Sequence, residues 1–129
     1  MIEPPSALQN ACVLLLEDDA LISIDTEDML MSLGVRRVLV AHSVEEAQAI
    51  VDRERVDAAV LDLVIGHDSC EDFASRLAAR HMPIVFASGM RDPGSLPEQL
   101  REVPTVDKPY TSQALHGALA RALRRITCG

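Results

Sequence analysis

Five apolar runs of strand length alternate with helical patterns along the chain, and this alternation restricts the possible folds more than any other feature. The runs are Cys12–Leu16, Arg37–Ala41, Asp57–Asp62, Ile84–Ser88 and Val103–Asp107. Strands that are almost continuously apolar and separated by helices form parallel sheets with both faces covered. Because crossovers between parallel strands are right-handed, few topologies remain. We therefore predict one α/β domain built on a doubly wound, five-stranded parallel sheet.

Local signals indicate where several helices begin and end. Ser43 is followed three residues later by Glu46, which is the pattern of a capping box at a helix start. Gly34 is placed to end the first helix, and Thr111 is placed to cap the last one. These signals predict helices on both sides of the second strand and after the fifth.

Prolines set limits on the fourth helix and the fifth strand. The stretch after the fourth strand contains Pro93, Gly94 and Pro97, so we predict only a short helix near Ser95–Arg101. Pro104 cannot donate a ladder hydrogen bond. This residue therefore places the fifth strand at an edge of the sheet.

Length and composition fit a single domain. Residues 1–11, with Pro4 and Pro5, are expected to form a flexible lead, residues 12–126 the domain and residues 127–129 a tail. The net charge of −8 would repel nucleic-acid phosphates and anionic membranes, so neither DNA nor a membrane is expected as a partner.

Cysteine usage and the absence of targeting signals point to the cytoplasm. Cys12, Cys70 and Cys128 are odd in number and widely spaced, which does not indicate a disulfide framework or a zinc site. No apolar run is long enough to span a bilayer, and no cationic start precedes a secretory segment.

Acidic residues, a hydroxyl and a lysine stand where the predicted strands end. The first strand is followed by Glu17-Asp18-Asp19, the third ends in Asp62, the fourth in Ser88, and the fifth is followed by Lys108. Sites in open α/β sheets form beyond these carboxyl ends. Oxygen-only ligands favour a hard cation such as Mg²⁺, or Mn²⁺, over zinc. A cation beside an ammonium and a hydroxyl would suit a phosphoryl group.

The motifs VLLLEDDALI, VLDL, FASG and VDKPY, in this order and spacing, resemble the receiver domains of two-component response regulators. The resemblance covers essentially residues 12–126 and implies the flavodoxin-like strand order 2-1-3-4-5. By position, it implies that Asp62 is the phosphoacceptor. It also implies that Glu17 and Asp18 hold Mg²⁺ directly or through water, with Asp62 and the backbone carbonyl of Val64 as further ligands.

The same resemblance assigns the phosphoryl-binding and tuning residues. Ser88 matches the switch hydroxyl, and Lys108 matches the lysine that pairs with a phosphoryl oxygen. The bond from Lys108 to Pro109 is expected to be cis, as is usual in the family. Val64 and Met90 stand at the positions that govern autodephosphorylation; both are apolar, which predicts a long-lived phosphoform.

These assignments predict a phosphoacceptor in a phosphorelay, which takes a phosphoryl group from a histidine kinase and signals through contacts with a downstream protein. The segment PIVFASGM resembles the FAT GUY subgroup of stand-alone receivers, whose kinases are often of the HWE type. No ATP-binding motif is present, so the chain is not expected to be a kinase. At most it would catalyse its own phosphorylation and dephosphorylation.

Two other functions compete with this interpretation. Thr105 replaces the aromatic residue often found three positions before the lysine, which favours a degenerate receiver that binds a partner without being phosphorylated. Glu17 and Asp19 have the spacing of a DxD phosphatase motif, although its first acid would be Glu. For Asp19 we favour a simpler role as the N-cap of the first helix.

Overall fold

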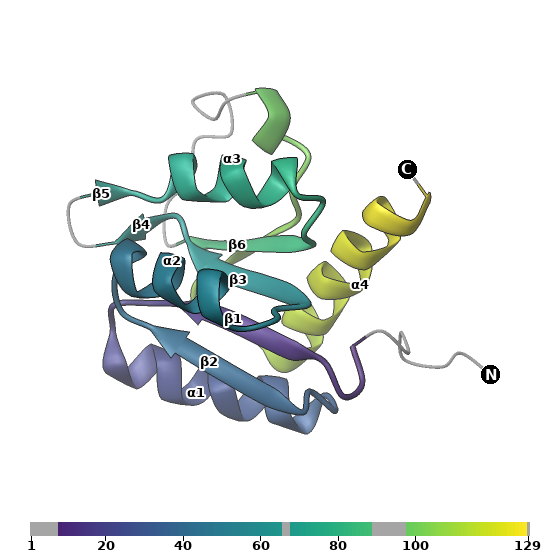
Figure 1. Cartoon of the computed structure of the whole chain (residues 1–129). Coiled ribbons are helices and arrows are strands. Elements are labelled where there is room, and N and C mark those ends of the chain that lie inside the picture. The colour runs from purple at the N-terminus through teal and green to yellow at the C-terminus, as the bar shows by residue number, and fades with distance from the viewer. Residues whose placement is uncertain (1–7, 66–67, 89–97, 129) are drawn as a thin grey trace.

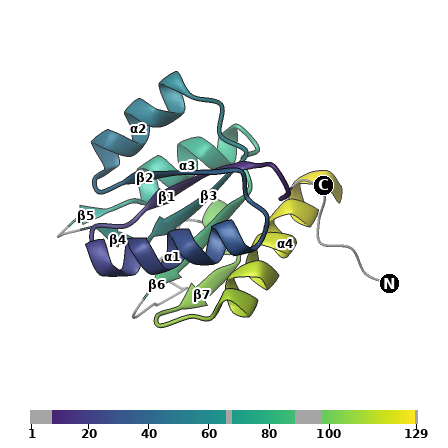
Figure 2. The same ribbon diagram turned by 90° about the horizontal axis from the view of Figure 1, so that it is seen from below.

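The chain folds around a five-stranded parallel sheet with helices on both faces (Figures 1 and 2). The computed structural model describes residues 8–65, 68–88 and 98–128. The strands are β1 (Cys12–Leu16), β2 (Arg37–Ala41), β3 (Ala58–Asp62), β6 (Ile84–Ser88) and β7 (Thr105–Asp107). Their order across the sheet is β2-β1-β3-β6-β7. This confirms the predicted flavodoxin-like order 2-1-3-4-5.

Helices cover both faces of the sheet, as Figure 2 shows. Helices α2 (Val44–Arg53) and α3 (Glu71–Ala79) lie on one face, and α1 (Ala20–Ser32) and α4 (Ser112–Cys128) lie on the other. Alternate residues of β1 serve both layers, because Leu14 and Leu16 join the first core cluster whereas Val13 and Leu15 join the second. This period of two follows from strand geometry.

The predicted caps are confirmed. The Ser43 hydroxyl accepts a hydrogen bond from the Glu46 N–H at 3.1 Å, and the Glu46 carboxylate accepts one from the His42 N–H at 2.8 Å. The Thr111 hydroxyl accepts one from the Ala114 N–H at 3.1 Å. Gly34 follows α1 with a φ of +97°, a backbone conformation that favours glycine.

The fifth strand lies at the sheet edge, as Pro104 predicted, but it begins later than expected. It starts at Thr105 instead of Val103, because Pro104 contributes only its carbonyl, which accepts from the Phe86 N–H at 2.9 Å. Of the fourth helix predicted near Ser95–Arg101, residues 95–97 lie outside the described residues. Glu98–Leu100 form a single 3₁₀ turn.

Two features differ from, or add to, the sequence-based expectation. Of the flexible lead predicted over residues 1–11, residues 1–7 lie outside the described residues. Its last part is packed, because Leu8 and Ala11 are buried in the core cluster that includes residues of α1 and α4. A small antiparallel hairpin, β4 (Val64–Ile65) and β5 (Asp68–Ser69), follows β3 and was not predicted. No helix in the described ranges is both long and apolar enough to cross a membrane.

Removing the Leu8 side chain tests whether the chain before β1 stabilises the domain. Leu8 is only 1% exposed, so Leu8→Ala should lower the free energy of unfolding by about 2–5 kcal/mol. The neighbouring Gln9 is exposed, and Gln9→Ala should change the free energy by less than about 0.5 kcal/mol. Urea unfolding followed by circular dichroism measures both. Equal, small effects would show that Leu8 is not part of the core.

Candidate functional site

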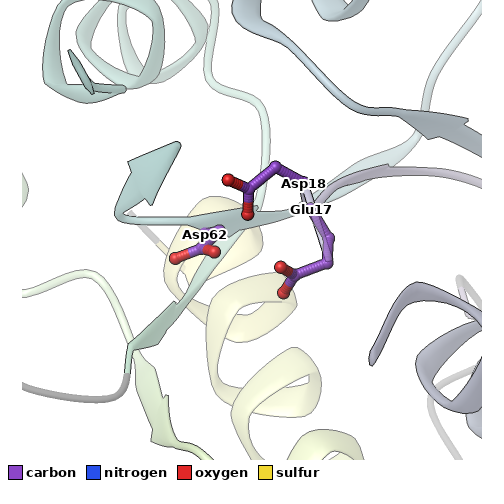
Figure 3. Close-up of side chains that lie close together, drawn as sticks. All are labelled: Glu17, Asp18 and Asp62. Atoms are coloured by element: carbon purple, nitrogen blue, oxygen red, sulfur yellow. The ribbon is translucent and has the colours of Figure 1, made fainter. Parts of the chain in front are cut away.

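The carboxyl ends of β1, β3 and β7 bring four charged side chains together. Glu17 and Asp18 directly follow β1, Asp62 ends β3, and Lys108 directly follows β7. Figure 3 shows the three carboxylates gathered at this edge. One oxygen from each of the three acids lies within 4.8 Å of the others. The sequence-based grouping of these side chains is therefore confirmed in space.

The Lys108 ammonium joins the two buried acids. Its Nζ lies 2.8 Å from Glu17 Oε1 and 2.8 Å from Asp62 Oδ2. The side chains of Lys108, Glu17 and Asp62 are 18%, 2% and 8% exposed, so this is a largely desolvated ion-pair network. Charge-assisted hydrogen bonds of this length are stronger than neutral ones. The network fixes the ends of three strands relative to one another.

Burial and pairing act in opposite directions on the pKa values of this network. Burial raises the pKa of Glu17, and the hydrogen bonds from Lys108 and from the Asp19 N–H only partly oppose this effect. For Lys108, burial lowers the pKa, but the hydrogen bonds to Asp62 and Glu17 raise it, and the net pKa lies above the ordinary value. Lys108 is therefore a permanent cation at neutral pH.

Main-chain contacts hold the charged residues in place. The Lys108 N–H donates to the Ser88 carbonyl at 2.9 Å, which ties the end of β7 to the end of β6. The Glu17 N–H donates to the Ala41 carbonyl at 3.0 Å, and the His42 ring donates through Nδ1 to the Glu17 carbonyl at 3.0 Å. The Lys108–Pro109 peptide is cis, as predicted.

The donor set fits a hard divalent cation. Only carboxylate oxygens converge at the described cluster, from the buried Glu17 and Asp62 and the exposed Asp18. Mg²⁺ and Mn²⁺ prefer such oxygen ligands. Ser88 is buried at the end of β6, one residue beyond Ala87, the register partner of Asp62. Its hydroxyl is thus placed at the same edge of the sheet.

Comparison with known proteins gives the family. No family model matches the chain, and no curated protein sequence matches it significantly. The solution structure of SdrG from Sphingomonas melonis Fr1 is 36% identical, with a TM-score of 0.77, over 91% of this chain and 98% of SdrG. The response-regulator REC domain of Erythrobacter litoralis PhyR is 26% identical, with a TM-score of 0.76, over 91% of this chain and 92% of that domain. The chain belongs to the response-regulator receiver family.

A more distant receiver agrees with the fold. A CheY-like receiver domain from Methylobacillus flagellatus is 21% identical and has a TM-score of 0.72 over 87% of this chain and 98% of that domain. The fold predicted from the alternating runs is thus that of the receiver family. The FAT GUY subgroup, indicated by PIVFASGM, stays a prediction.

Other predicted residues of this receiver have different outcomes. Asp19 is the N-cap of α1, because its Oδ1 accepts from the N–H groups of Leu21 and Ile22 at 2.9 and 3.2 Å. The N-cap interpretation is therefore confirmed. Val64 lies in β4, where its backbone is described. Met90 lies outside the described residues, so its predicted influence on dephosphorylation stays a prediction.

Two contacts near the site were not predicted from the sequence. The buried Cys70 thiol donates to the main-chain carbonyl of Asp62 at 3.0 Å. Burial, followed by the negative charge of Asp62, raises the pKa of Cys70 to about 12. Thr26 and Tyr110 share a hydrogen bond of 2.6 Å between α1 and the β7–α4 connection. Residue spacing predicts neither contact. Thr26 and Tyr110 are distant in sequence, and the contact of Cys70 with the end of β3 depends on the conformation of the connection between them.

An open groove adjoins the lysine. Its volume is about 300 Å³. It is lined by residues of α1 and of the segment after β7, namely Ile22, Asp25, Thr26, Met29, Lys108, Pro109 and Tyr110. Lys108 therefore borders this groove as well as the acids Glu17 and Asp62.

Replacing Lys108 by a neutral side chain of similar length tests the energetic role of the buried ammonium. Lys108→Met leaves Glu17 and Asp62 facing each other without a cation, so the free energy of unfolding should fall by about 3 kcal/mol at neutral pH. The matched control is Arg37→Met, which removes an ion pair to Glu54 whose side chains are 50% and 32% exposed. That pair should contribute under about 1 kcal/mol. Equal effects in urea unfolding would contradict a special role for Lys108.

Proposed function

We propose that this receiver accepts a phosphoryl group on Asp62 from the phosphohistidine of a histidine kinase, with Mg²⁺ bound. The observation that carries the proposal is the contact of the Lys108 ammonium with Asp62 Oδ2, beside a cluster of three carboxylates. A carboxylate held by a fixed cation at the open edge of a sheet is suited to nucleophilic attack on phosphorus.

The transfer balances without an external oxidant or reductant. An Asp62 carboxylate oxygen forms a bond to phosphorus as the bond from phosphorus to the histidine nitrogen breaks. The nitrogen keeps the electron pair of that bond, and the imidazole leaves as a neutral group because its other ring nitrogen carries a proton. Mg²⁺, held by Asp18, Asp62, the Val64 carbonyl and Glu17 directly or through water, would supply positive charge that offsets the phosphoryl oxygens.

Lys108 and Ser88 provide the remaining recognition. Lys108 already points its ammonium at Asp62, so it can pair with a phosphoryl oxygen on that residue with little reorganisation. The Ser88 hydroxyl would donate a hydrogen bond to a second phosphoryl oxygen. This contact can move the end of β6 and thereby change the affinity for a protein partner. Thr105 stands at the position where an aromatic switch is common, so the change is expected to differ from an aromatic rotamer exchange.

A relative of this chain supports the proposal. SdrG has been solved in a BeF₃-activated conformation, which is 36% identical to this chain with a TM-score of 0.71 over 89% of it. BeF₃ is an isostere of a phosphoryl group. We propose the same chemistry for Asp62 and place it in the cytoplasm. The PIVFASGM segment leads us to propose a histidine kinase of the HWE type as the phosphoryl donor.

Phosphorylation by a small donor tests the proposal directly. Acetyl phosphate with Mg²⁺ should add one phosphoryl group to the wild-type chain, and chelation of the cation should prevent it. Asp62→Asn should abolish the addition and keep the fold, because the side chains are nearly isosteric. The control is Asp107→Asn, which changes an exposed acid at the end of β7 and should leave phosphorylation intact.

Intact mass before and after acid treatment gives the readout. A phosphoryl group carried by His67, which lies outside the described residues, would overturn the role of Asp62. A folded wild-type chain that accepts no phosphoryl group from either acetyl phosphate or a kinase would instead support a degenerate receiver that acts as a binding module.

The lifetime of the phosphoform gives a second test. Val64 stands two residues beyond the phosphoacceptor and has no polar side chain to orient an attacking water. Val64→Asn should therefore shorten the half-life of phospho-Asp62 several-fold, which is less than the roughly 10²- to 10⁴-fold that a positioned general base can supply, because an amide can only orient the water. Val64→Leu is the apolar control. Decay of the phosphorylated mass after removal of the donor measures all three rates, and equal rates would refute the role given to Val64.

A further inference from the structure

Cys70 holds the main chain at the point where β3 ends in the phosphoacceptor. Its thiol donates to the Asp62 carbonyl at 3.0 Å, and its own N–H donates to the Leu63 carbonyl at 3.1 Å. One residue therefore binds two successive carbonyls. We propose that Cys70 is a positioning residue, which orients the Asp62–Val64 backbone for cation binding and phosphoryl transfer. This role rests on the proposed function.

The Cys70 thiol contacts β3 just beyond the last residue that pairs with β1. The register between β1 and β3 ends at Leu16 and Leu61, whereas the register between β3 and β6 continues to Asp62 and Ala87. Asp62 therefore lies one residue beyond its pairing with β1. The Cys70 thiol donates to its carbonyl there, where the β1–β3 pairing has ended. A hydrogen bond to a buried carbonyl is costly to break, so this contact limits the orientations of the Asp62 peptide group.

The next carbonyls along the chain show why this matters. The Leu63 N–H donates to the Ala87 carbonyl at 3.1 Å, so residue 63 is held by β6 on its N–H and by Cys70 on its carbonyl. The Val64 carbonyl, which we propose as a cation ligand, follows immediately. Rotation of the preceding peptide groups would displace both this carbonyl and the Asp62 carboxylate. Groups that orient metal ligands in this way commonly affect metal affinity strongly.

The environment of Cys70 favours a donor over a reactive thiol. The residue is 1% exposed and lies in the core cluster with Phe73, Ala74 and Leu77, at the start of α3. A buried, protonated thiol neither attacks electrophiles nor binds metals readily. It retains its proton and can therefore donate a hydrogen bond to the carbonyl. Its position at the start of α3 also couples that helix to the phosphoacceptor strand.

Three variants separate the donor role from packing. Cys70→Ala removes the thiol, and Cys70→Ser keeps a donor of nearly the same shape. The control Cys12→Ala removes the other buried thiol of the described residues, which lies at the start of β1, whereas Glu17 follows the end of that strand. Each is titrated with Mg²⁺ and followed by amide NMR shifts, and its rate of phosphorylation by acetyl phosphate is measured. Urea unfolding gives the stability of each variant.

Cys70→Ala should bind Mg²⁺ about 3- to 10-fold more weakly. This loss is smaller than the roughly 10- to 100-fold typical of outer-shell contacts, because a thiol is a weak donor. Cys70→Ser should restore most of this loss, and Cys12→Ala should leave the affinity unchanged even where it lowers stability. Unchanged affinity in Cys70→Ala, or equal losses in the Ala and Ser variants, would overturn the positioning role alone. Wild-type protein that neither binds Mg²⁺ nor accepts a phosphoryl group would overturn the proposed function and this role with it.

Discussion

The Lys108 ammonium, bonded at 2.8 Å to both Glu17 and Asp62, is the interaction on which the geometry of the site depends. Two carboxylates brought this close near a protein surface repel by an amount of order 1–4 kcal/mol. A shared ammonium converts the repulsion into attraction, but only if the three side chains come from strand ends that lie together. The charge pattern and the sheet topology therefore constrain each other.

The strand order supplies this juxtaposition. β1 and β3 are neighbours, and β6 separates β3 from the edge strand β7. Lys108 therefore has to reach across the end of β6, and its N–H anchors on the Ser88 carbonyl as it does so. Ser88 is thus placed between Lys108 and Asp62 by backbone pairing, independently of its hydroxyl. A long, flexible lysine side chain is suited to this span, because its stem can lie along apolar surface while its ammonium stays at the acids.

Much of this arrangement could be predicted from the sequence, because it depends on patterns that are local. Apolar runs gave the strands to within two residues, and the acids and lysine were found because they terminate those runs. Contacts that depend on loop conformation carry no such pattern. Leu8 follows a proline pair in a stretch without periodicity, yet it belongs to the core cluster that includes residues of α1 and α4. The β4–β5 hairpin has only two residues on each side, and Cys70 contacts Asp62 across this hairpin. For these residues, the tertiary structure decides the contact.

Glu17 and Asp18 are neighbours in the chain but differ in burial. Glu17 is fixed on every side: Oε1 accepts from Lys108, Oε2 from the Asp19 N–H at 3.1 Å, and its carbonyl from His42. Asp18 is exposed and follows it directly. Glu17 is therefore the fixed partner that keeps Lys108 beside Asp62. The buried acid sets the position of the lysine, whereas the exposed acid lies at the solvent boundary, from which the cation of the proposed function would enter, so the two carboxylates are suited to different tasks because they differ in burial.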